Sequence, residues 1–365
     1  MALPLIELSG TPFEQGVQHG RALKNRIIHN LELYFERFKT EVFLERPEVL
    51  RRAELYAAAI AADNPAYYET MQGVAEGAAL PFGDIAALNV RYEILYYEFG
   101  VGENARAQIK GSDGCTSFAL MPERTSNAHL LMGQSWDWIP GIKGALLKTR
   151  EEAGLKVLAF TEAGIVGGKI GLNSSGLGLC INGLASLVDD WTTLAKPFHV
   201  RCFEILRQTS LEAARAVVTE TSRPGSANFL LAQAPDAVLN LETAPDVFSE
   251  TLADEGARVH TNHFENPAAL ALSELENEFW QYSCGRQRRL QTLLASKARL
   301  SISDLKSFLR DHDGRPNSVC RHEDPDFGPE EHYISVVSVL MDLNTQTLWL
   351  SDGPPCEHPF DEYGL

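Results

Sequence analysis

The sequence predicts an α+β fold with a helix-rich N-terminal part and many short strands after it, and three observations support this. Apolar residues recur at three- and four-residue spacing in residues 12–98, which is the period of an amphipathic helix. After residue 115 the chain changes to short segments that alternate apolar and polar side chains, as half-buried strands do. Helical segments interrupt these strands in pairs, an order that suits two sheets flanked by helices.

The N-terminal part is expected to be helical up to a loop at residues 100–112. Thr11 is a suitable N-cap residue and Pro12 suits the first helical position, so a helix should begin here. Further helices are expected at 48–63 and 84–98. The apolar face of the first helix is formed by Leu23, Ile27, Leu31 and Tyr34.

The C-terminal part should consist mainly of strands. Alternation predicts strands at 116–121, 129–136, 156–161, 177–181, 228–233, 237–243, 333–341 and 347–351. The helical period predicts helices at 199–208, 211–221 and 273–295. We find no internal repeat, low-complexity run or long linker.

Composition excludes several classes of function. The chain has 365 residues, of which 44% are hydrophobic and 22% charged, as is typical of a soluble globular protein. Its formal net charge is −17, and we find no run rich in Lys or Arg. Binding to nucleic acid or to an anionic membrane is therefore not expected, because both need a basic surface.

The ends of the chain and its cysteines predict a cytoplasmic protein. No secretory signal, no apolar stretch of membrane-spanning length and no Ser-Lys-Leu end is present. The cysteines show no Cys-x-x-Cys spacing, so free thiols in a reducing compartment are expected rather than a disulfide framework. They are Cys115, Cys180, Cys202, Cys284, Cys320 and Cys356.

The segment 111–117, Gly-Ser-Asp-Gly-Cys-Thr-Ser, is the most informative stretch of the chain. Because Gly114 has no Cβ, its peptide bond to Cys115 can adopt a strained geometry in which the cysteine sulfur approaches the Gly114 carbonyl. An N-to-S acyl shift followed by hydrolysis would make Cys115 a new N-terminus. Its α-amine, with an ordinary pKa of roughly 7.7–8.0, could then serve as the base for its own thiol. The alternative is a turn followed by a buried structural thiol.

Five other segments occur in a characteristic order along with this one. They are Gly-Thr-Pro-Phe-Glu-Gln-Gly-Val-Gln-His-Gly at 10–20, Gly-Gln-Ser-Trp-Asp-Trp at 133–138, the Gly-rich run 161–184, His-Thr-Asn-His at 260–263 and Ser-Val-Cys-Arg at 318–321. Together they resemble the isopenicillin N acyltransferase family, the acyl-CoA:6-aminopenicillanic acid acyltransferases, from about residue 8 to about residue 340. This family belongs to the N-terminal-nucleophile hydrolases, which include the more distant penicillin V acylase and bile salt hydrolase group.

The resemblance implies a four-layer αββα sandwich and an enzyme activated by self-cleavage between Gly114 and Cys115. Residues 1–114 would form a helix-rich α subunit. Residues 115–365 would form a catalytic β subunit that begins at the nucleophile, and both would belong to one integrated globular domain.

The resemblance also implies roles for individual residues. Cys115 would be the nucleophile in self-cleavage and in turnover. Ser117 would assist self-cleavage, although it could equally be an ordinary strand serine. Asp137 would orient the new α-amine and stabilise its protonated form; the alternative is a carboxylate in a turn.

Three more residues complete the expected site. Asn262 would donate to the oxyanion that forms when the thiolate attacks a carbonyl carbon. Asn182 is a second candidate donor, or an Asn in a turn at the end of a strand. Arg321 would pair with the carboxylate network or with product, or else form a structural ion pair.

Two residues differ from the family pattern, and two motifs superficially match a metal site and a dinucleotide site. Family members often carry Asn where this chain has Ser135, and the more distant hydrolases carry Arg where it has Gln134. His260 and His263 lack the spacing and the glutamate of a helical zinc motif, so no metal is expected there. The glycines 176 and 178 lack the remainder of a dinucleotide fingerprint and are expected to allow tight strand turns.

The sequence therefore predicts an enzyme that takes an acyl group from an amide or thioester and passes it to an amine or to water. No cofactor is expected, although the resemblance allows a coenzyme A thioester as substrate. The expected partners are a small-molecule acyl donor, its acceptor and the other cleavage fragment. The alternatives are a plain hydrolase of small N-acylated amines or N-acyl amino acids, and a non-catalytic scaffold that retains the fold.

Overall fold

A computed structural model describes residues 3–101, 114–151, 154–273, 278–326, 328 and 332–365. The segment 111–113 of the proposed cleavage motif and most of the expected loop at 100–112 lie outside the described residues. Gly114 and Cys115 are described.

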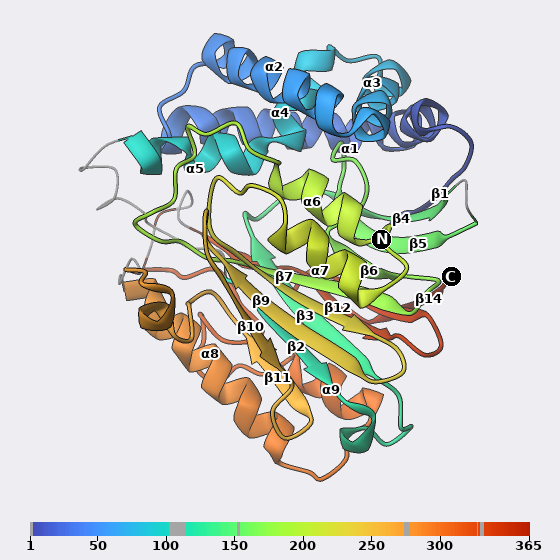
Figure 1. The fold of residues 1–365 in the computed structure, drawn as a ribbon, viewed down its shortest axis with the longest axis vertical. Helices are drawn as coiled ribbons and strands as arrows, with labels where there is room; N and C mark the ends of the chain where they lie inside the picture. The colour runs from blue at the N-terminus through green and yellow to red at the C-terminus, as the bar shows by residue number, and fades with distance from the viewer. Residues whose placement is uncertain (1–2, 102–113, 152–153, 274–277, 327, 329–331) are drawn as a thin grey trace.

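Two sheets stack face to face and form the middle of the molecule (Figure 1). The eight-stranded sheet has the order β1 (Leu5–Leu8), β4 (Gly144–Arg150), β5 (Lys156–Glu162), β6 (Ile170–Asn173), β7 (Leu177–Gly183), β8 (Ala227–Gln233), β9 (Ala237–Thr243) and β10 (Phe248–Leu252). The six-stranded sheet has the order β11 (Ala257–His260), β2 (Thr116–Leu120), β3 (Leu131–Trp138), β12 (Ile334–Asp342), β13 (Thr347–Asp352) and β14 (Asp361–Gly364).

Helices cover the outer face of each sheet, which confirms the αββα prediction (Figure 1). The eight-stranded sheet is covered by α1 (Pro12–Glu41), α2 (Arg46–Asp63), α3 (Pro65–Ala78), α4 (Phe82–Asn89), α5 (Arg91–Val101), α6 (Phe198–Ile205) and α7 (Leu211–Thr219). The six-stranded sheet is covered by α8 (Glu278–Ala295) and α9 (Ile302–Phe308), whose leucines pack against Phe118 and Leu120 of β2.

The expected helices and strands are present, with one expected helix divided in two and several further elements that the sequence pattern did not predict, which are β1, β4, β6, β10, β11, β14, α3 and α9. The single helix expected at 84–98 is two helices, because the backbone leaves the helical region at Val90. Helix α3 was not expected, although Asn64 caps it by accepting a hydrogen bond from the Tyr67 N–H at 2.9 Å. Strand β4 was also missed, since buried residues on both of its faces remove the alternation that marks a half-buried strand.

Strand β1 ties the N-terminal segment to the rest of the molecule. It pairs with β4 in parallel, the only parallel pairing among the named strands of the two described sheets. The segment before the proposed cleavage site therefore contributes backbone hydrogen bonds to the same sheet as the segment after it.

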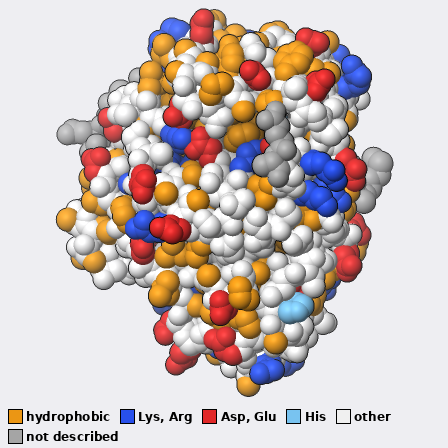
Figure 2. Space-filling model, turned by 45° about the vertical axis from the view of Figure 1, so that its right-hand side comes forward, with side chains coloured by type: hydrophobic (Ala, Val, Ile, Leu, Met, Phe, Trp, Pro, Cys, Tyr) orange, Lys and Arg blue, Asp and Glu red, His pale blue; other side chains and the backbone are white. Residues whose placement is uncertain are grey.

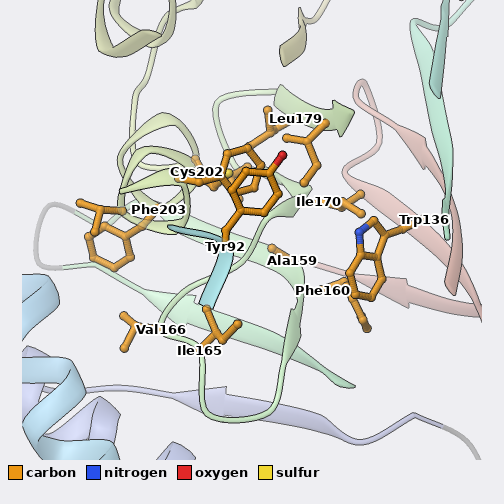
Figure 3. Close-up of a cluster of buried hydrophobic side chains, with 14 of the residues drawn as sticks. Tyr92, Trp136, Ala159, Phe160, Ile165, Val166, Ile170, Leu179, Cys202 and Phe203 are labelled. Atoms are coloured by element: carbon orange, nitrogen blue, oxygen red, sulfur yellow. The ribbon is translucent and has the colours of Figure 1, made fainter. Parts of the chain in front are cut away.

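The main core lies between the helices and the eight-stranded sheet and extends between the two sheets. Figure 3 shows part of it, with Tyr92 from α5, Cys202 from α6, and Trp136 from β3 beside Phe160 from β5. The Trp136 and Phe160 ring centroids are 5.6 Å apart. The Trp136–Phe160 contact thus connects the two sheets.

The charged side chains on the surface do not gather by sign on the face that Figure 2 shows. Acidic and basic side chains are interspersed with apolar ones across the face shown in Figure 2. Among the residues that the structure describes, no helix is both long enough and apolar enough to cross a membrane.

Helices α1 and α3 approach each other closely at four glycines, Gly16 and Gly20 on α1 and Gly73 and Gly77 on α3. A Cβ at Gly73 would overlap the Phe13 carbonyl oxygen and lie 2.9 Å from the Gly16 Cα. These contacts involve backbone atoms, which cannot move aside without separating the helices.

We predict that Gly73→Ala lowers the free energy of unfolding by about 1–3 kcal/mol, the usual cost of overpacking. The matched control is Gly285→Ala on α8, where a Cβ meets no atom within 4 Å. The control should be neutral or stabilising, because Ala favours a helix over Gly. Urea denaturation of both variants measures the difference, and equal stability would contradict the close packing of α1 on α3.

Candidate active site

Cys115 lies immediately before β2 and is 1% exposed. Its side chain packs in the main core together with Ala119, whereas Phe118 and Leu120 point to the opposite side, toward α8 and α9. The thiol is therefore enclosed by the protein.

Gly114 packs directly against two charged side chains. A Cβ at this position would overlap Nη1 of Arg321 and lie 2.8 Å from Oδ2 of Asp137. Only glycine fits without moving one of these groups. The structure thus brings together three residues singled out from the sequence, although they lie up to 207 positions apart (321 − 114 = 207).

Ser335 on β12 holds the two charged residues in place. Its hydroxyl donates to Oδ1 of Asp137 at 2.7 Å and accepts from the Arg321 backbone N–H at 2.9 Å. Its own N–H donates to the Arg321 carbonyl at 3.1 Å. Asp137 is fully buried on β3, so its position is set by the sheet and by this serine.

A second buried guanidinium, Arg286 on α8, also lies near the cysteine. Burial lowers its pKa to about 10 and repulsion from Arg321 adds to this effect, while Asp137 and Cys115 act in the opposite direction. Burial likewise lowers the pKa of Arg321, and Asp137 opposes this. Two guanidinium groups around one carboxylate give a local excess of positive charge, which favours a thiolate or an oxyanion.

Arg286 connects Asn262 to the strand that begins at the cysteine. Its Nη2 donates to Oδ1 of Asn262 at 3.0 Å, and its Nε donates to Oγ1 of Thr116 at 3.3 Å. Nδ2 of Asn262 donates to the Gly183 carbonyl at 3.0 Å. An amide nitrogen carries two hydrogens, so one N–H of Asn262 remains for a ligand within the part of the chain that the structure describes.

Ser117 and Asn182 lie together between the two sheets. The Ser117 hydroxyl donates to Oδ1 of Asn182 at 2.7 Å, and Nδ2 of Asn228 donates to the same oxygen at 3.1 Å. Nδ2 of Asn182 is 3.4 Å from the His260 carbonyl. The Asn182 amide thus links the sheets through both of its ends, a structural role that the sequence left open.

Gln134 and Ser135, the two residues that differ from the family pattern, both make hydrogen-bonding contacts with neighbouring strands. Gln134 reaches across to β7, where its Oε1 accepts from the Ile181 N–H at 2.9 Å and its Nε2 donates to the Ile181 carbonyl. The Ser135 hydroxyl lies 2.9 Å from that of Ser338 on β12. Both side chains fix the position of β3, which carries Asp137.

The two histidines of the 260–263 motif contact polar side chains of the protein. Nε2 of His260 lies 2.8 Å from Oε1 of Glu242, and Nδ1 of His263 lies 2.8 Å from the Ser283 hydroxyl. Burial lowers the pKa of His263 to about 4. Gly176 has a φ of 71° in the turn between β6 and β7, as expected for a strand turn.

A buried charge cluster near the cysteine was not predicted. Glu162 accepts hydrogen bonds from Arg91, Lys169 and the Tyr34 hydroxyl. Burial alone would raise the pKa of Glu162, but Arg91 and Lys169 hold it well below its usual range. Nζ of Lys169 lies 3.2 Å from the Trp136 ring centroid.

Lys169 belongs to the surroundings of Cys115. Burial lowers the pKa of Lys169 to about 8, while Glu162 and, more weakly, the charge of Cys115 raise it. The only local sign in the sequence is a lysine between glycines in Gly-Gly-Lys-Ile-Gly, inside an otherwise apolar run. The electrostatic surroundings of the thiol therefore include cations on both sides of the six-stranded sheet.

The sequence comparisons assign the family. Residues 123–355, more than half of the chain, match the family described as acyl-coenzyme A:6-aminopenicillanic acid acyl-transferase. The chain belongs to this family. It is 30% identical over 328 residues to the 40 kDa form of acyl-coenzyme A:6-aminopenicillanic-acid-acyltransferase from Emericella nidulans, which covers 87% of this chain and 84% of that protein.

The family match includes Asp137, Asn182, Asn262 and Arg321 but begins eight residues after Cys115 (123 − 115 = 8). The recognition of the family from sequence motifs is thus confirmed. By this family assignment the protein is an enzyme that acts on acyl substrates.

Two solved structures are also similar. An N-acylethanolamine-hydrolyzing acid amidase ortholog from Caenorhabditis elegans has 15% identity and a TM-score of 0.47, covering 63% of this chain and 93% of that one. Penicillin V acylase from Agrobacterium tumefaciens has 16% identity and a TM-score of 0.45, and the match covers 65% of this chain and 83% of that one.

We predict that Arg286→Met slows alkylation of Cys115 by iodoacetamide at pH 7, because it removes one of the cations that favour the thiolate. Arg288→Met is the matched control, since Arg288 lies on the same helix but is exposed. Peptide mass spectrometry measures the rate at Cys115 in each variant. Equal rates in the Arg286 variant and the wild type would contradict the assigned electrostatics.

Proposed function

We propose that the protein is a self-processing cysteine acyltransferase whose nucleophile is Cys115. It takes an acyl group from an amide or from a coenzyme A thioester and transfers it to an amine or to water. One observation carries the proposal: Gly114, the residue on the acyl side of the bond to be cut, packs against Asp137 and Arg321. The precursor therefore holds its own peptide as a first substrate.

Self-cleavage would proceed in two steps. The Cys115 sulfur attacks the Gly114 carbonyl carbon, the C–N bond breaks, and the thiol proton goes to the departing nitrogen. This gives a thioester and a free α-amine on Cys115. Water then hydrolyses the thioester, which restores the thiol and leaves Gly114 with a carboxylate.

Turnover would repeat the same chemistry on an external substrate. The α-amine takes the thiol proton, the thiolate attacks the donor carbonyl, and the protonated amine gives its proton to the leaving group. The acyl group then occupies the position that Gly114 held. An amine or water attacks the thioester carbon and releases the product. Asp137 would hold the α-ammonium, and the second N–H of Asn262 would donate to the oxyanion.

Several contacts support the proposal that the fragments 1–114 and 115–365 stay together after cleavage. Strand β1 pairs with β4 over four residues, from Leu5 to Leu8. Nδ2 of Asn30 donates to the Lys143 and Ala163 carbonyls at 2.9 and 3.1 Å. The buried cluster around Glu162 also takes Tyr34 and Arg91 from the first fragment. Separation would expose these groups and a large apolar surface.

The substrate class follows from the relatives. The Emericella protein is named for acyl-coenzyme A and 6-aminopenicillanic acid. We propose the same type of acyl donor here. A panel of acyl-coenzyme A, N-acyl amino acid and β-lactam compounds, each tested with and without an amine acceptor, distinguishes transfer from hydrolysis of small N-acylated amines.

We predict that the purified wild-type protein consists of residues 1–114 and 115–365, the second fragment having 251 residues (365 − 114 = 251). Cys115→Ala should remain one chain, because no thiol can attack the Gly114 carbonyl. Cys284→Ala is the control and should be processed normally. Intact-mass measurement gives the result, and size exclusion under reducing conditions should show that the fragments co-elute. Active wild-type enzyme that is a single chain would contradict the proposal.

We also predict that Asn262→Ala lowers kcat by about 10²–10³-fold, as does loss of one oxyanion donor. The variant should be made in a pre-cut form, with 115–365 starting at the cysteine and co-expressed with 1–114, so that slow cleavage does not obscure turnover. If the pre-cut variant turned over substrate at the wild-type rate, Asn262 would not be an oxyanion donor.

The pH dependence of the wild type tests the base. Activity should rise with pH as the α-amine loses its proton, near pKa values of roughly 7.7–8.0.

A further inference from the structure

Four potential metal ligands from three separate segments converge at one end of β12. They are His312, Cys320, His322 and Cys356, and their ligand atoms all lie within 4.8 Å of one another. Cys320 is buried and Cys356 is exposed, so the cluster extends from the interior to the surface. The sequence alone predicts free thiols at both cysteines and no metal site.

Three of these atoms surround a single ring nitrogen. Nε2 of His322 lies 3.1 Å from Nε2 of His312, 3.5 Å from Sγ of Cys320 and 3.3 Å from Sγ of Cys356. An imidazole nitrogen has one in-plane direction in which to donate or accept a hydrogen bond. It cannot make hydrogen bonds to three groups at once, so hydrogen bonding does not explain the arrangement.

The three separations from Nε2 of His322 agree with those between ligands of a tetrahedral metal ion. Zinc–sulfur bonds of about 2.3 Å and zinc–nitrogen bonds of about 2.0–2.1 Å place two nitrogens about 3.3 Å apart, and a sulfur and a nitrogen about 3.5 Å apart. The observed separations of 3.1, 3.5 and 3.3 Å lie within a few tenths of an ångström of these values.

We propose that His312, Cys320, His322 and Cys356 form a structural zinc site. Two thiolates and two neutral imidazoles are a ligand set that suits zinc, and four protein ligands leave no open position for catalysis. Binding releases the two thiol protons to solvent. The resulting centre is electrically neutral, because two thiolate charges balance the charge of the ion.

Groups around the four ligands are arranged to support them. Oε1 of Glu357 lies 3.6 Å from Nδ1 of His322, the nitrogen that faces away from the cluster. A carboxylate there orients a metal-bound histidine. The Cys320 N–H donates to the Asp311 carbonyl at 3.0 Å, and Nε of Arg310 donates to the Pro355 carbonyl at 2.7 Å. These bonds hold the segments that carry both cysteines.

The proposed site lies next to the active site along the chain. Arg321, which packs against Gly114, stands between the ligands Cys320 and His322. Zinc would therefore tie this loop to the segment around Cys356 and fix the backbone on both sides of the arginine. The metal would act on the structure of the loop and not on the substrate.

Metal analysis of the full chain tests the site. Protein purified without an affinity tag or chelator should contain about one zinc ion per chain, as expected for a four-ligand structural site. The Cys356→Ser variant should lose the zinc. Cys356 is an exposed loop residue, so this substitution leaves the core intact. Cys284→Ser, which changes a cysteine outside the cluster, should keep the zinc. Inductively coupled plasma mass spectrometry gives the content.

A second measurement does not depend on a variant that folds. Wild-type protein stripped by a chelator and given one equivalent of Co²⁺ should develop thiolate-to-cobalt charge-transfer absorption and lose it when zinc is added. Wild-type protein that carries no zinc and gives no such absorption would overturn the proposal. A disulfide between Cys320 and Cys356 would also overturn it. It would be seen as an intact mass two hydrogens below that of the reduced protein, together with a peptide in which the two cysteines are joined.

Discussion

The close packing of Gly114 against Asp137 and Arg321 is the contact on which the rest of the site depends. It places a backbone segment where a side chain cannot fit, between groups of opposite charge that are both buried. Ser335 holds these two groups at a fixed separation through three hydrogen bonds. Because the sheet fixes Asp137 and Ser335, the peptide that precedes Cys115 has little freedom to take another position.

Buried charge is the second constraint, and it connects the two halves of the chain. Taking the charges of Arg91, Glu162 and Lys169 out of water is costly unless each finds a partner. Arg91 comes from α5, whereas Glu162 and Lys169 flank the turn between β5 and β6. The cluster is therefore complete only when the helical layer is docked on the eight-stranded sheet. The same cluster contributes a positive charge near the thiol, so folding and reactivity depend on one set of contacts.

Much of the fold and part of the site could be predicted from the sequence. Alternation located most strands, and the Gly114–Cys115 junction together with ordered motifs indicated the family. Strand β4 was missed because a strand that is buried on both faces does not alternate. The packing of α1 on α3 left a visible signal in the Gly-x-x-x-Gly spacing on both helices, which helical periodicity alone does not interpret.

Side-chain roles that depend on distant partners could not be predicted. Nothing local to Arg286 shows that it reaches Asn262 and Thr116 from another element. The amide of Asn182 has the right chemistry for an oxyanion donor, but its bonds between the sheets are visible only in three dimensions. Cys356 lies 34 residues beyond His322, so only the fold shows that they are neighbours.

The most direct test of the account is to find the acyl group on the enzyme. The mature protein is mixed with an acyl-coenzyme A donor without an amine acceptor, quenched with acid within the first turnovers, and digested for peptide mass spectrometry. The account predicts that the fragment beginning at residue 115 gains the mass of one acyl group, and that the group maps to the sulfur of Cys115. An acyl group on another side chain, or undiminished turnover after Cys115 has been alkylated, would contradict it.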